Sequence, residues 1–553
     1  MTFVFLKKRY NCFQIHLRFP NKFMKKFVRF AKFFTVLFLL SFANAQEASV
    51  KTYDVVIKNA RIVDGTGNPW FKSDIGIKDG RIARIGFIAD IEAKQTVDAK
   101  NQIVAPGFID VHAHTENIFN RPEAENFIRM GVTSLVTGNC GGSVTDVGSF
   151  LGRFEKTPLT INLATLIAHG SVRAKVMGAE NRAPTAEELQ KMEAIVEQGM
   201  KDGAVGLSTG LIYVPGTYAK TDEVVALARV AEKHRGIYAS HIRNEGDKVF
   251  EAVSEAINIG EQAGIPVEIS HFKISSKKHW GKTEETLGLV RAAREKGLSV
   301  TVDQYAYTAS STSLDTMLPS WALENGREAG KKRLTDEATR KKVTDEITKT
   351  LKDSKFKDFS YAYVAGYAAN KSFNGLNIKE IAKREKGKDN LAAQIEQILE
   401  MYAGGGAQMV FRKMSEEDVQ NIMRAPFTMI ASDSGVREFG EGAPHPRGYG
   451  NNVRVLGRYV RELKIITLED AIRKMTSLPA QTFRLKDRGL IREGFAADLV
   501  IFDEKTVADK ATFENPHQYP VGISSVFVNG KAVISDGQLT NVRSGTALRI
   551  NEN

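Results

Sequence analysis

Two histidines stand two positions apart at the end of an apolar stretch, His112 and His114 in GFIDVHAH. On an extended strand, residues i and i+2 point to the same side, so both imidazoles could bind one metal ion. Such a pair is common by chance, and the assignment needs further ligands. The chain contains only ten histidines, so their placement is informative.

Four more ligand-type side chains follow short apolar runs in the same way. Each alone has an ordinary interpretation as a core residue or a helix cap, but chance does not easily place all of them after such runs. A thiolate among imidazoles favours zinc over magnesium or calcium. We therefore predict a zinc site from the two histidines together with Cys140 in TSLVTGNCGG, His241 in YASHIRNEG, His271 in VEISHFK and Asp433 in MIASDSG.

The runs that carry these residues alternate with amphipathic helical segments, such as 185–203, which starts with a Thr cap and a Glu three residues later. This alternation is typical of βα units and a parallel sheet. Eight strands predict a closed (β/α)8 barrel of α/β class, in which active sites lie at the carboxyl ends of the strands. We predict these strands near 103–111, 132–138, 161–168, 204–208, 236–242, 266–272, 299–305 and 427–432.

Two further regions lie outside the simple barrel pattern of 101–484. The interval 306–426 is too long for a loop and has helical patterns of its own, so we predict an inserted subdomain between strands seven and eight, over the barrel mouth. The end regions 46–100 and 485–553 contain short strands with Asp-Gly and Asn-Gly turns. We expect them to pair into one small β domain; two unrelated hairpins are the alternative.

Composition narrows the class of partner. Hydrophobic residues make up 42% of the chain and charged residues 26%, as in ordinary globular proteins. The formal charge is +12, but nine of the 77 Lys and Arg residues lie in 1–45, where there is no Asp or Glu. The other 68 nearly balance the 65 acidic residues, which gives no argument for a nucleic-acid partner.

Residues 1–45 have the pattern of a signal peptide. Four basic residues between 25 and 32 precede the apolar run 33–42, which is too short to span a bilayer, and Ala43-Asn44-Ala45 is typical of a cleavage site. We expect export to the periplasm or secretion, with no membrane contact after cleavage; an uncleaved anchor is the alternative. Residues 1–23 precede Met24, a second candidate start. Cleavage would leave Cys140 as the single thiol, either inert or a metal ligand.

The whole pattern resembles a known family. The two histidines after strand one, single histidines after strands five and six, the Asp after strand eight and the β domain resemble the amidohydrolase superfamily. The Cys after strand two, with no Lys in GAVGLSTGLIYVPG around strand four, resembles its N-acyl-D-amino-acid deacylase (D-aminoacylase) branch. The resemblance covers nearly all of 50–540. It implies zinc-dependent hydrolysis of N-acyl-D-amino acids, or of dipeptides with a C-terminal D-residue.

The resemblance also implies roles for the predicted ligands. Zinc lowers the pKa of a bound water molecule and polarises the scissile carbonyl. Asp433 would accept a proton from this water and pass it to the leaving amine. One zinc would be bound tightly and a second, weaker position would adjoin it. The tight position would be held by Cys140, His241 and His271, and the adjoining one by His112, His114 and Asp433.

Other residues point to an anionic small-molecule substrate, an acylated amino acid with a free carboxylate. The resemblance assigns the carboxylate to Lys273 and Arg447, and an Arg fork binds carboxylates with two parallel hydrogen bonds. By the same resemblance Tyr213, Tyr305 and Ser311 line the substrate pocket.

Two other functions stay open at this stage. Another metal-dependent amidohydrolase, such as a cyclic-amide or cyclic-imide hydrolase, would fit the ligands, although such relatives usually carry the strand-four Lys. A non-catalytic barrel protein is an alternative of a different class, but such proteins typically lose metal ligands. The acyl group, the preferred side chain, the number of working metal ions and the oligomeric state are not determined by the sequence.

Overall fold

The computed structural model describes residues 52–89 and 93–550, and all of these from Tyr53 onward belong to the compact unit Tyr53–Asn553. The signal peptide predicted at 1–45 lies outside these residues. Within the described ranges, none of the helices combines the length and the apolar character needed to cross a membrane.

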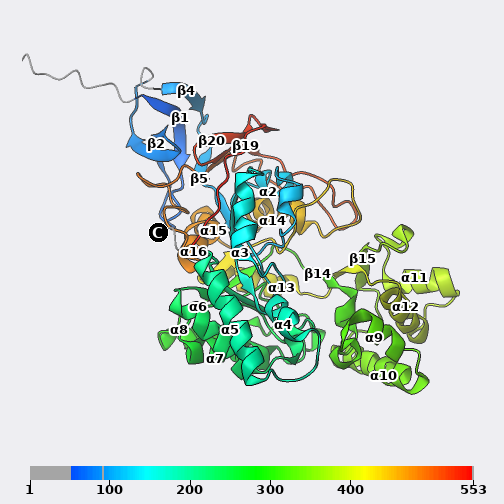
Figure 1. Cartoon of the computed structure of the whole chain (residues 1–553). Helices are drawn as coiled ribbons and strands as arrows, with labels where there is room; N and C mark the ends of the chain where they lie inside the picture. Colours follow the sequence, from blue (N-terminus) through cyan, green and yellow to red (C-terminus); the bar gives the residue numbers. More distant parts are fainter. Residues whose placement is uncertain (1–51, 90–92, 551–553) are drawn as a thin grey trace, which may run out of the picture. The chain divides into compact units, whose positions relative to one another are not determined.

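Short parallel strands form the centre of the fold (Figure 1). One sheet has the order β17-β13-β12-β11-β10-β9 and another the order β6-β7-β8, and β8 and β9 are separated only by Leu166. A parallel bridge between Ala113 and Ser434 brings the last strand beside the first. This is the arrangement of a (β/α)8 fold. The strands are β6 (Phe108–Asp110), β7 (Val132–Thr137), β8 (Asn162–Thr165), β9 (Ile167–Ala168), β10 (Gly206–Gly210), β11 (Ile237–His241), β12 (Val267–Ile269), β13 (Val300–Gln304) and β17 (Thr428–Ile430).

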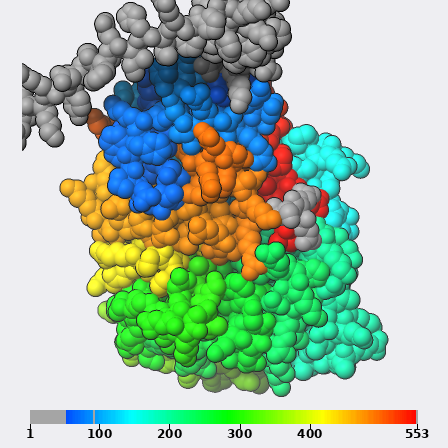
Figure 2. Space-filling model, turned by 90° about the vertical axis from the view of Figure 1, so that its left-hand side faces the viewer, coloured from blue at the N-terminus to red at the C-terminus, as the bar shows by residue number. Residues whose placement is uncertain are grey.

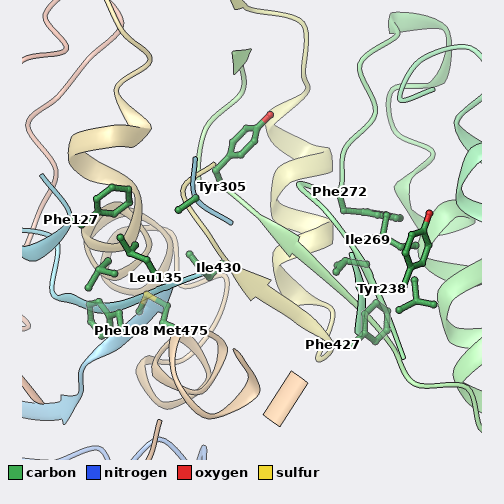
Figure 3. Close-up of a cluster of buried hydrophobic side chains, with 14 of the residues drawn as sticks. Phe108, Phe127, Leu135, Tyr238, Ile269, Phe272, Tyr305, Phe427, Ile430 and Met475 are labelled. Atoms are coloured by element: carbon green, nitrogen blue, oxygen red, sulfur yellow. The ribbon is translucent and has the colours of Figure 1, made fainter. Parts of the chain in front are cut away.

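Amphipathic helices cover these strands. Helix α5 starts with the predicted capping box, in which the Thr185 side chain and the Glu188 side chain each accept from the other's backbone N–H. Figure 3 shows the strand residues Phe108 and Leu135 beside the helix residues Phe127 and Met475, and Ile269 beside Phe272 in another part of the same buried core. The helices are α2 (Glu125–Ile128), α4 (His169–Met177), α5 (Ala186–Lys201), α6 (Thr221–Lys233), α7 (Val249–Ala263), α8 (Thr283–Glu295), α13 (Glu416–Arg424), α14 (Arg447–Arg454) and α15 (Leu468–Met475).

The first predicted strand, 103–111, is divided between two sheets. Its first half, β5 (Ile103–Pro106), pairs with strands of the β domain, and its second half is β6 of the barrel. Gly107 separates them, and a Cβ at this position would lie 2.2 Å from Thr133 Oγ1. The chain changes sheet where its backbone passes too close to β7 for a side chain, so the single strand predicted from the apolar run was wrong.

Both ends of the described chain build the second sheet. Its order is β21-β20-β19-β18-β5-β1-β2-β3, with β4 paired to β1. In Figure 2 the blue surface of the early strands adjoins orange surface from late in the chain, and the backbone N–H of Ile82 donates to Phe495 O. The strands are β1 (Tyr53–Ile62), β2 (Phe71–Lys78), β3 (Arg81–Gly86), β4 (Ala93–Asp98), β18 (Leu499–Phe502), β19 (Ile523–Val528), β20 (Lys531–Ser535) and β21 (Gln538–Leu539).

The interval between β13 and β17 forms a group of elements with its own buried core, seen in green to yellow in Figure 1. The predicted interval 306–426 is longer than this group, because α13 packs against β13, β17 and α8 as a barrel helix. The group contains β14 (Ser310–Ser313), α9 (Gly326–Arg333), α10 (Glu337–Asp353), β15 (Ala362–Gly366), α11 (Ile378–Lys386), α12 (Leu391–Ala403) and β16 (Gln408–Phe411), and β16 lies between β14 and β15.

A buried lysine on α15 makes the stability of this fold depend on pH. Lys474 is fully buried and donates to the carbonyls of Ala425 and Thr428, and burial lowers its pKa from 10.5 to about 8. The unfolded chain keeps this proton up to about pH 10.5, so the free energy of unfolding should rise with pH between the two values. The pKa difference corresponds to a rise of about 3 kcal/mol.

Lys474→Met should remove this rise of the free energy of unfolding with pH. The substitution can also change the free energy of unfolding by an amount that is the same at every pH, which does not affect the comparison of slopes. Denaturant unfolding of both proteins at about pH 7 and about pH 10 measures the difference between their slopes. Parallel changes in the two proteins would show that Lys474 stays charged in the folded chain throughout this range.

Candidate metal centre

The six predicted ligands come together at the carboxyl ends of the barrel strands. They form three overlapping groups, and within each group the ligand atoms lie within 4.8 Å of one another. Cys140 is central: its Sγ lies 3.2 Å from His112 Nε2 and 3.5 Å from both His241 Nδ1 and His271 Nε2. The thiol therefore faces three imidazole nitrogens at once.

Asp433 lies on the other side of the cluster. Its Oδ1 is 3.2 Å from His114 Nε2 and 3.8 Å from His112 Nε2, and its Oδ2 is 2.9 Å from Arg447 Nη2. The two histidines of the GFIDVHAH segment thus lie between the carboxylate and the thiol. This arrangement provides donors for two adjoining metal positions.

Three of these ligands have an unusual backbone. Cys140, His271 and Asp433 have φ values of 54°, 38° and 51°. This left-handed region is uncommon for residues other than glycine, and it turns the chain sharply where the strand ends. Backbone hydrogen bonds hold two of these turns, from His271 N to Asp303 Oδ1 and from Asp433 N to His112 O. Three of the six candidate ligands thus lie at sharp backbone turns.

The charges in the cluster favour anionic ligands. Burial alone would raise the pKa of the Cys140 thiol, but His112, His271 and His241 hold it well below its usual value. Burial alone would also raise the pKa of the Asp433 carboxyl, but Arg447 and His114 hold it well below its usual value. Thiolate and carboxylate are the ionisation states in which these groups bind a metal.

A second layer of carboxylates, which sequence reasoning missed, orients the histidines. Asp303 Oδ2 is 2.9 Å from His112 Nδ1, which directs Nε2 of that ring into the cluster. Glu245 Oε1 is 3.1 Å from His271 Nδ1 and 3.7 Å from His241 Nε2. A signal for Asp303 was present, since it lies near the end of the predicted seventh strand. Glu245 lies in a loop, where no pattern identified it.

Asp303→Asn should weaken metal binding without removing any direct ligand. Loss of such an outer carboxylate typically lowers metal affinity about 10–100-fold, because the ring it orients becomes less basic and less fixed. Competition with a chelator of known affinity measures the change. Asn keeps an acceptor for His271 N, so an unchanged affinity would show that the contact with His112 does not influence the metal.

A cavity of about 500 Å³ opens over the cluster and contains most of the predicted substrate residues. Lys273 and Arg447 line it although they are only 4% and 2% exposed. Lys273 Nζ contacts Glu245 and lies 2.9 Å from His271 Nδ1. Arg447 Nη2 pairs with Asp433, whereas its Nε and Nη1 are buried with no hydrogen-bond partner in the described chain. The cavity thus combines a metal cluster with two buried cations.

The remaining predicted pocket residues have different positions. Tyr213 and Ser311 line the cavity, and the Tyr213 ring lies 4.8 Å from that of His241. Tyr305 is not among its lining residues: the Tyr305 ring lies under Arg447, 4.5 Å from the guanidinium, and its hydroxyl faces Met414.

The loop that carries Arg447 is fixed by a neutral histidine. Burial holds the pKa of His445 well below its usual value, and Arg447 lowers it further. The ring can therefore accept at Nδ1 from Arg447 N (3.0 Å) and donate from Nε2 to Ala309 O (2.8 Å). His445 therefore holds the loop that carries Arg447 against the segment at Ala309.

Comparisons with known proteins agree with this site. The model of the amidohydrolase family matches residues 95–534. A D-aminoacylase from Alcaligenes xylosoxydans xylosoxydans is 34% identical over 530 residues, 91% of this chain and 99% of that protein, and an N-acyl-D-glutamate deacylase from the same organism is 35% identical over 519 residues, 90% of this chain and 96% of that protein.

Solved structures give the same result. The N-acyl-D-glutamate deacylase from Bordetella bronchiseptica, complexed with zinc and a phosphonate inhibitor, superimposes with a TM-score of 0.77 at 34% identity, covering 90% of this chain and all of that one. The matches extend over both the barrel and the β domain. This chain therefore belongs to the amidohydrolase family, in its D-aminoacylase branch.

Proposed function

We propose that this protein is a zinc-dependent deacylase that hydrolyses the amide bond of N-acyl-D-amino acids. The observation that carries the proposal is one cavity in which a thiolate and imidazole cluster lies beside two buried cations. The cluster suits an amide carbonyl and the cations suit a carboxylate, the two groups that every N-acyl amino acid contains. The relatives named D-aminoacylase and N-acyl-D-glutamate deacylase support the D configuration.

The donor set fits zinc. A thiolate and neutral imidazoles are its preferred ligands, and three protein donors leave a position open for water or substrate. When bound, zinc activates water and polarises a carbonyl. Cys140, His241 and His271 form one of the three groups and would hold the tight ion. The weaker position would lie at His112, His114 and Asp433, where Asp433 Oδ1 lies 3.8 Å and 3.2 Å from the two Nε2 atoms.

Asp433 is the residue that moves the proton. Its carboxylate is ionised and lies at the edge of the cluster, so it can accept a proton from the attacking water. The same oxygen can then donate this proton to the leaving amine. Arg447, 2.9 Å from the other oxygen, keeps the carboxylate oriented while the proton is transferred.

Lys273 and Arg447 would hold the substrate carboxylate. Both are buried, and Arg447 has two nitrogens without partners that could form a pair of parallel hydrogen bonds. When the two cations bind the substrate carboxylate, they orient the amide without contacting the scissile bond themselves. Tyr213 and Ser311 would line the pocket around the bound substrate, with Tyr305 supporting the two cations from below.

The alternatives have weaker support. A cyclic-amide hydrolase of the usual type needs a lysine at strand four, but β10 reads GLSTG. A non-catalytic protein has no need for six converging ligands and two buried cations.

The decisive experiment compares paired N-acetyl-D- and N-acetyl-L-amino acids with the zinc-loaded protein. We expect hydrolysis of D substrates with a free carboxylate and loss of activity on their carboxamides, which the two cations cannot bind as anions. Equal activity on acids and amides would contradict the assignment of Lys273 and Arg447. Activity on cyclic imides, with none on N-acyl amino acids, would show that the protein is a cyclic-imide hydrolase instead.

We also propose export to the periplasm or secretion, supported by the basic and apolar segment that precedes Ala43-Asn44-Ala45. Amino-terminal sequencing of the mature protein tests this, with Gln46 as the expected first residue. A chain in the cytoplasmic fraction that keeps the segment would contradict it.

A further inference from the structure

A second cavity of about 520 Å³ adjoins the one over the metal cluster. Tyr213 and Ser313 line both, so the two cavities are neighbours at this point. The Tyr213 hydroxyl is hydrogen-bonded to Thr312 Oγ1 (2.9 Å), which joins the loop after β10 to β14. Apolar residues such as Ile212 and Leu318 form part of the wall of the second cavity. An N-acetyl group would not need this space.

The strand that connects the two cavities has a free edge. Among the described strands, β14 pairs with β16 alone and forms one edge of its three-stranded sheet. The carbonyl of Ser311 accepts from Arg447 Nη2 (3.4 Å), and that of Ser313 accepts from Thr316 Oγ1 (2.8 Å). These carbonyls therefore point away from β16, and the N–H of the same residue points the same way. The outward carbonyls already have partners within the protein, but the outward N–H groups of this edge can donate to an extended peptide.

The far part of the second cavity offers polar groups for a ligand. Tyr402 is 1% exposed, and its hydroxyl has no hydrogen-bond partner in the described residues. Asp315 Oδ1 also has no hydrogen-bond partner in the described residues, whereas Oδ2 of the same carboxylate pairs with Arg327 Nη2 at 2.6 Å. Because Arg327 already balances the charge of Asp315, a neutral donor such as an amide N–H fits better than a second cation.

We infer that the second cavity and the edge of β14 bind a peptidyl acyl group, so that the preferred substrates are peptides of at least three residues that end in a D-amino acid. The inference rests on the proposed function. The carboxylate of the D-residue occupies Arg447 and Lys273, the scissile carbonyl lies at the cluster, and the acyl part extends along Ser311–Ser313 for about 7 Å. Water adds its hydroxyl to the carbonyl carbon and a proton to the amine nitrogen, which releases a shorter peptide and a free D-amino acid.

The first test compares three substrates with the same leaving D-amino acid: the N-acetyl compound, the acetyl-alanyl-alanyl compound and the N-octanoyl compound. The peptidyl compound should have a kcat/KM about tenfold or more above the N-acetyl one, as one or two added hydrogen bonds allow. An equal or larger gain for the octanoyl compound would overturn the inference in favour of a fatty-acyl site. The absence of any gain for the peptidyl compound would overturn it outright.

A matched pair of variants at Ser313 tests the edge of β14 directly. Ser313 has φ −67°, which proline adopts, so Ser313→Pro removes the outward N–H with little strain. Ser313→Ala removes the same hydroxyl, which accepts from Asp315 N, but keeps the N–H. The ratio of kcat/KM for the peptidyl and N-acetyl compounds should fall about tenfold in Ser313→Pro alone. Equal ratios in the two variants would contradict pairing along this edge.

Thr217→Trp provides an independent variant if Ser313→Pro does not fold. The larger side chain fills the second cavity from the barrel side, so the ratio of kcat/KM for the peptidyl and N-acetyl compounds should fall as in Ser313→Pro.

Calorimetry with the product acetyl-alanyl-alanine separates failure of the inference from failure of the proposed function. Tighter binding to the wild-type protein than to Ser313→Pro would support the peptide site even if no N-acyl-D-amino acid were hydrolysed. No difference in binding would overturn the inference even if deacylation were confirmed.

Discussion

Asp433→Asn should lower kcat by about 10²–10⁴-fold, the usual contribution of a general base and acid. The substitution keeps the size of the side chain but removes its ability to accept the proton. The tight zinc should remain, because Cys140, His241 and His271 do not include this residue, and KM should change little. Steady-state kinetics together with metal analysis of the same preparation measures both effects.

Arg447→Ala is the matching comparison, because its largest effect should be a raised KM, as expected for binding that the ground and transition states share, with a smaller loss of kcat from the altered orientation of Asp433. Since Arg447 Nη2 lies 2.9 Å from Asp433 Oδ2, the two substitutions are not independent, and the double variant should lose less than the two single losses combined. If Asp433→Asn mainly raised KM while Arg447→Ala mainly lowered kcat, the two roles would have to be exchanged. No effect of Asp433→Asn on either constant would require another base.

Cys140→Ala should remove zinc and activity together. The thiolate is the most central donor of the cluster, within 3.5 Å of three imidazole nitrogens, so its loss leaves the tight ion with two ligands. Cys140→Asp should keep part of both, because a carboxylate is also a zinc ligand. Zinc content per chain and turnover, measured on one sample, test the prediction. Normal zinc and normal turnover in Cys140→Ala would show that this cysteine is only a core residue.

The sequence was a reliable guide where a local pattern has a direct structural consequence. Apolar runs of strand length can be recognised without tertiary information, and five of them end at or near one of the six candidate metal ligands in the structure. The side-chain period of two places His112 and His114 on one side of the chain. The C-terminal ends of parallel barrel strands share one face of the fold. Strand order alone therefore sufficed to predict that distant residues such as Cys140 and His271 would meet.

Other features depend on contacts between segments far apart in the chain. An apolar run has no mark of where it changes sheet, so the division at Gly107 follows only from the closeness of Thr133. The backbone reversals at Cys140, His271 and Asp433 likewise result from packing, since none of these residues favours a positive φ strongly. Asp303 and Glu245 are ordinary acidic residues in the sequence, and only their distance to the histidines gives them a role.

The sequence by itself predicted the class of fold, six candidate metal ligands and two candidate cations for a carboxylate, because residue type and strand position are local properties. Only the tertiary structure decided how these parts influence one another. It placed Arg447 against Asp433, put Tyr305 beneath the cations instead of in the cavity, and set the free edge of β14 beside the metal cluster. Each of these depends on the angle and distance between separate elements, which packing of the whole chain sets and no single segment encodes.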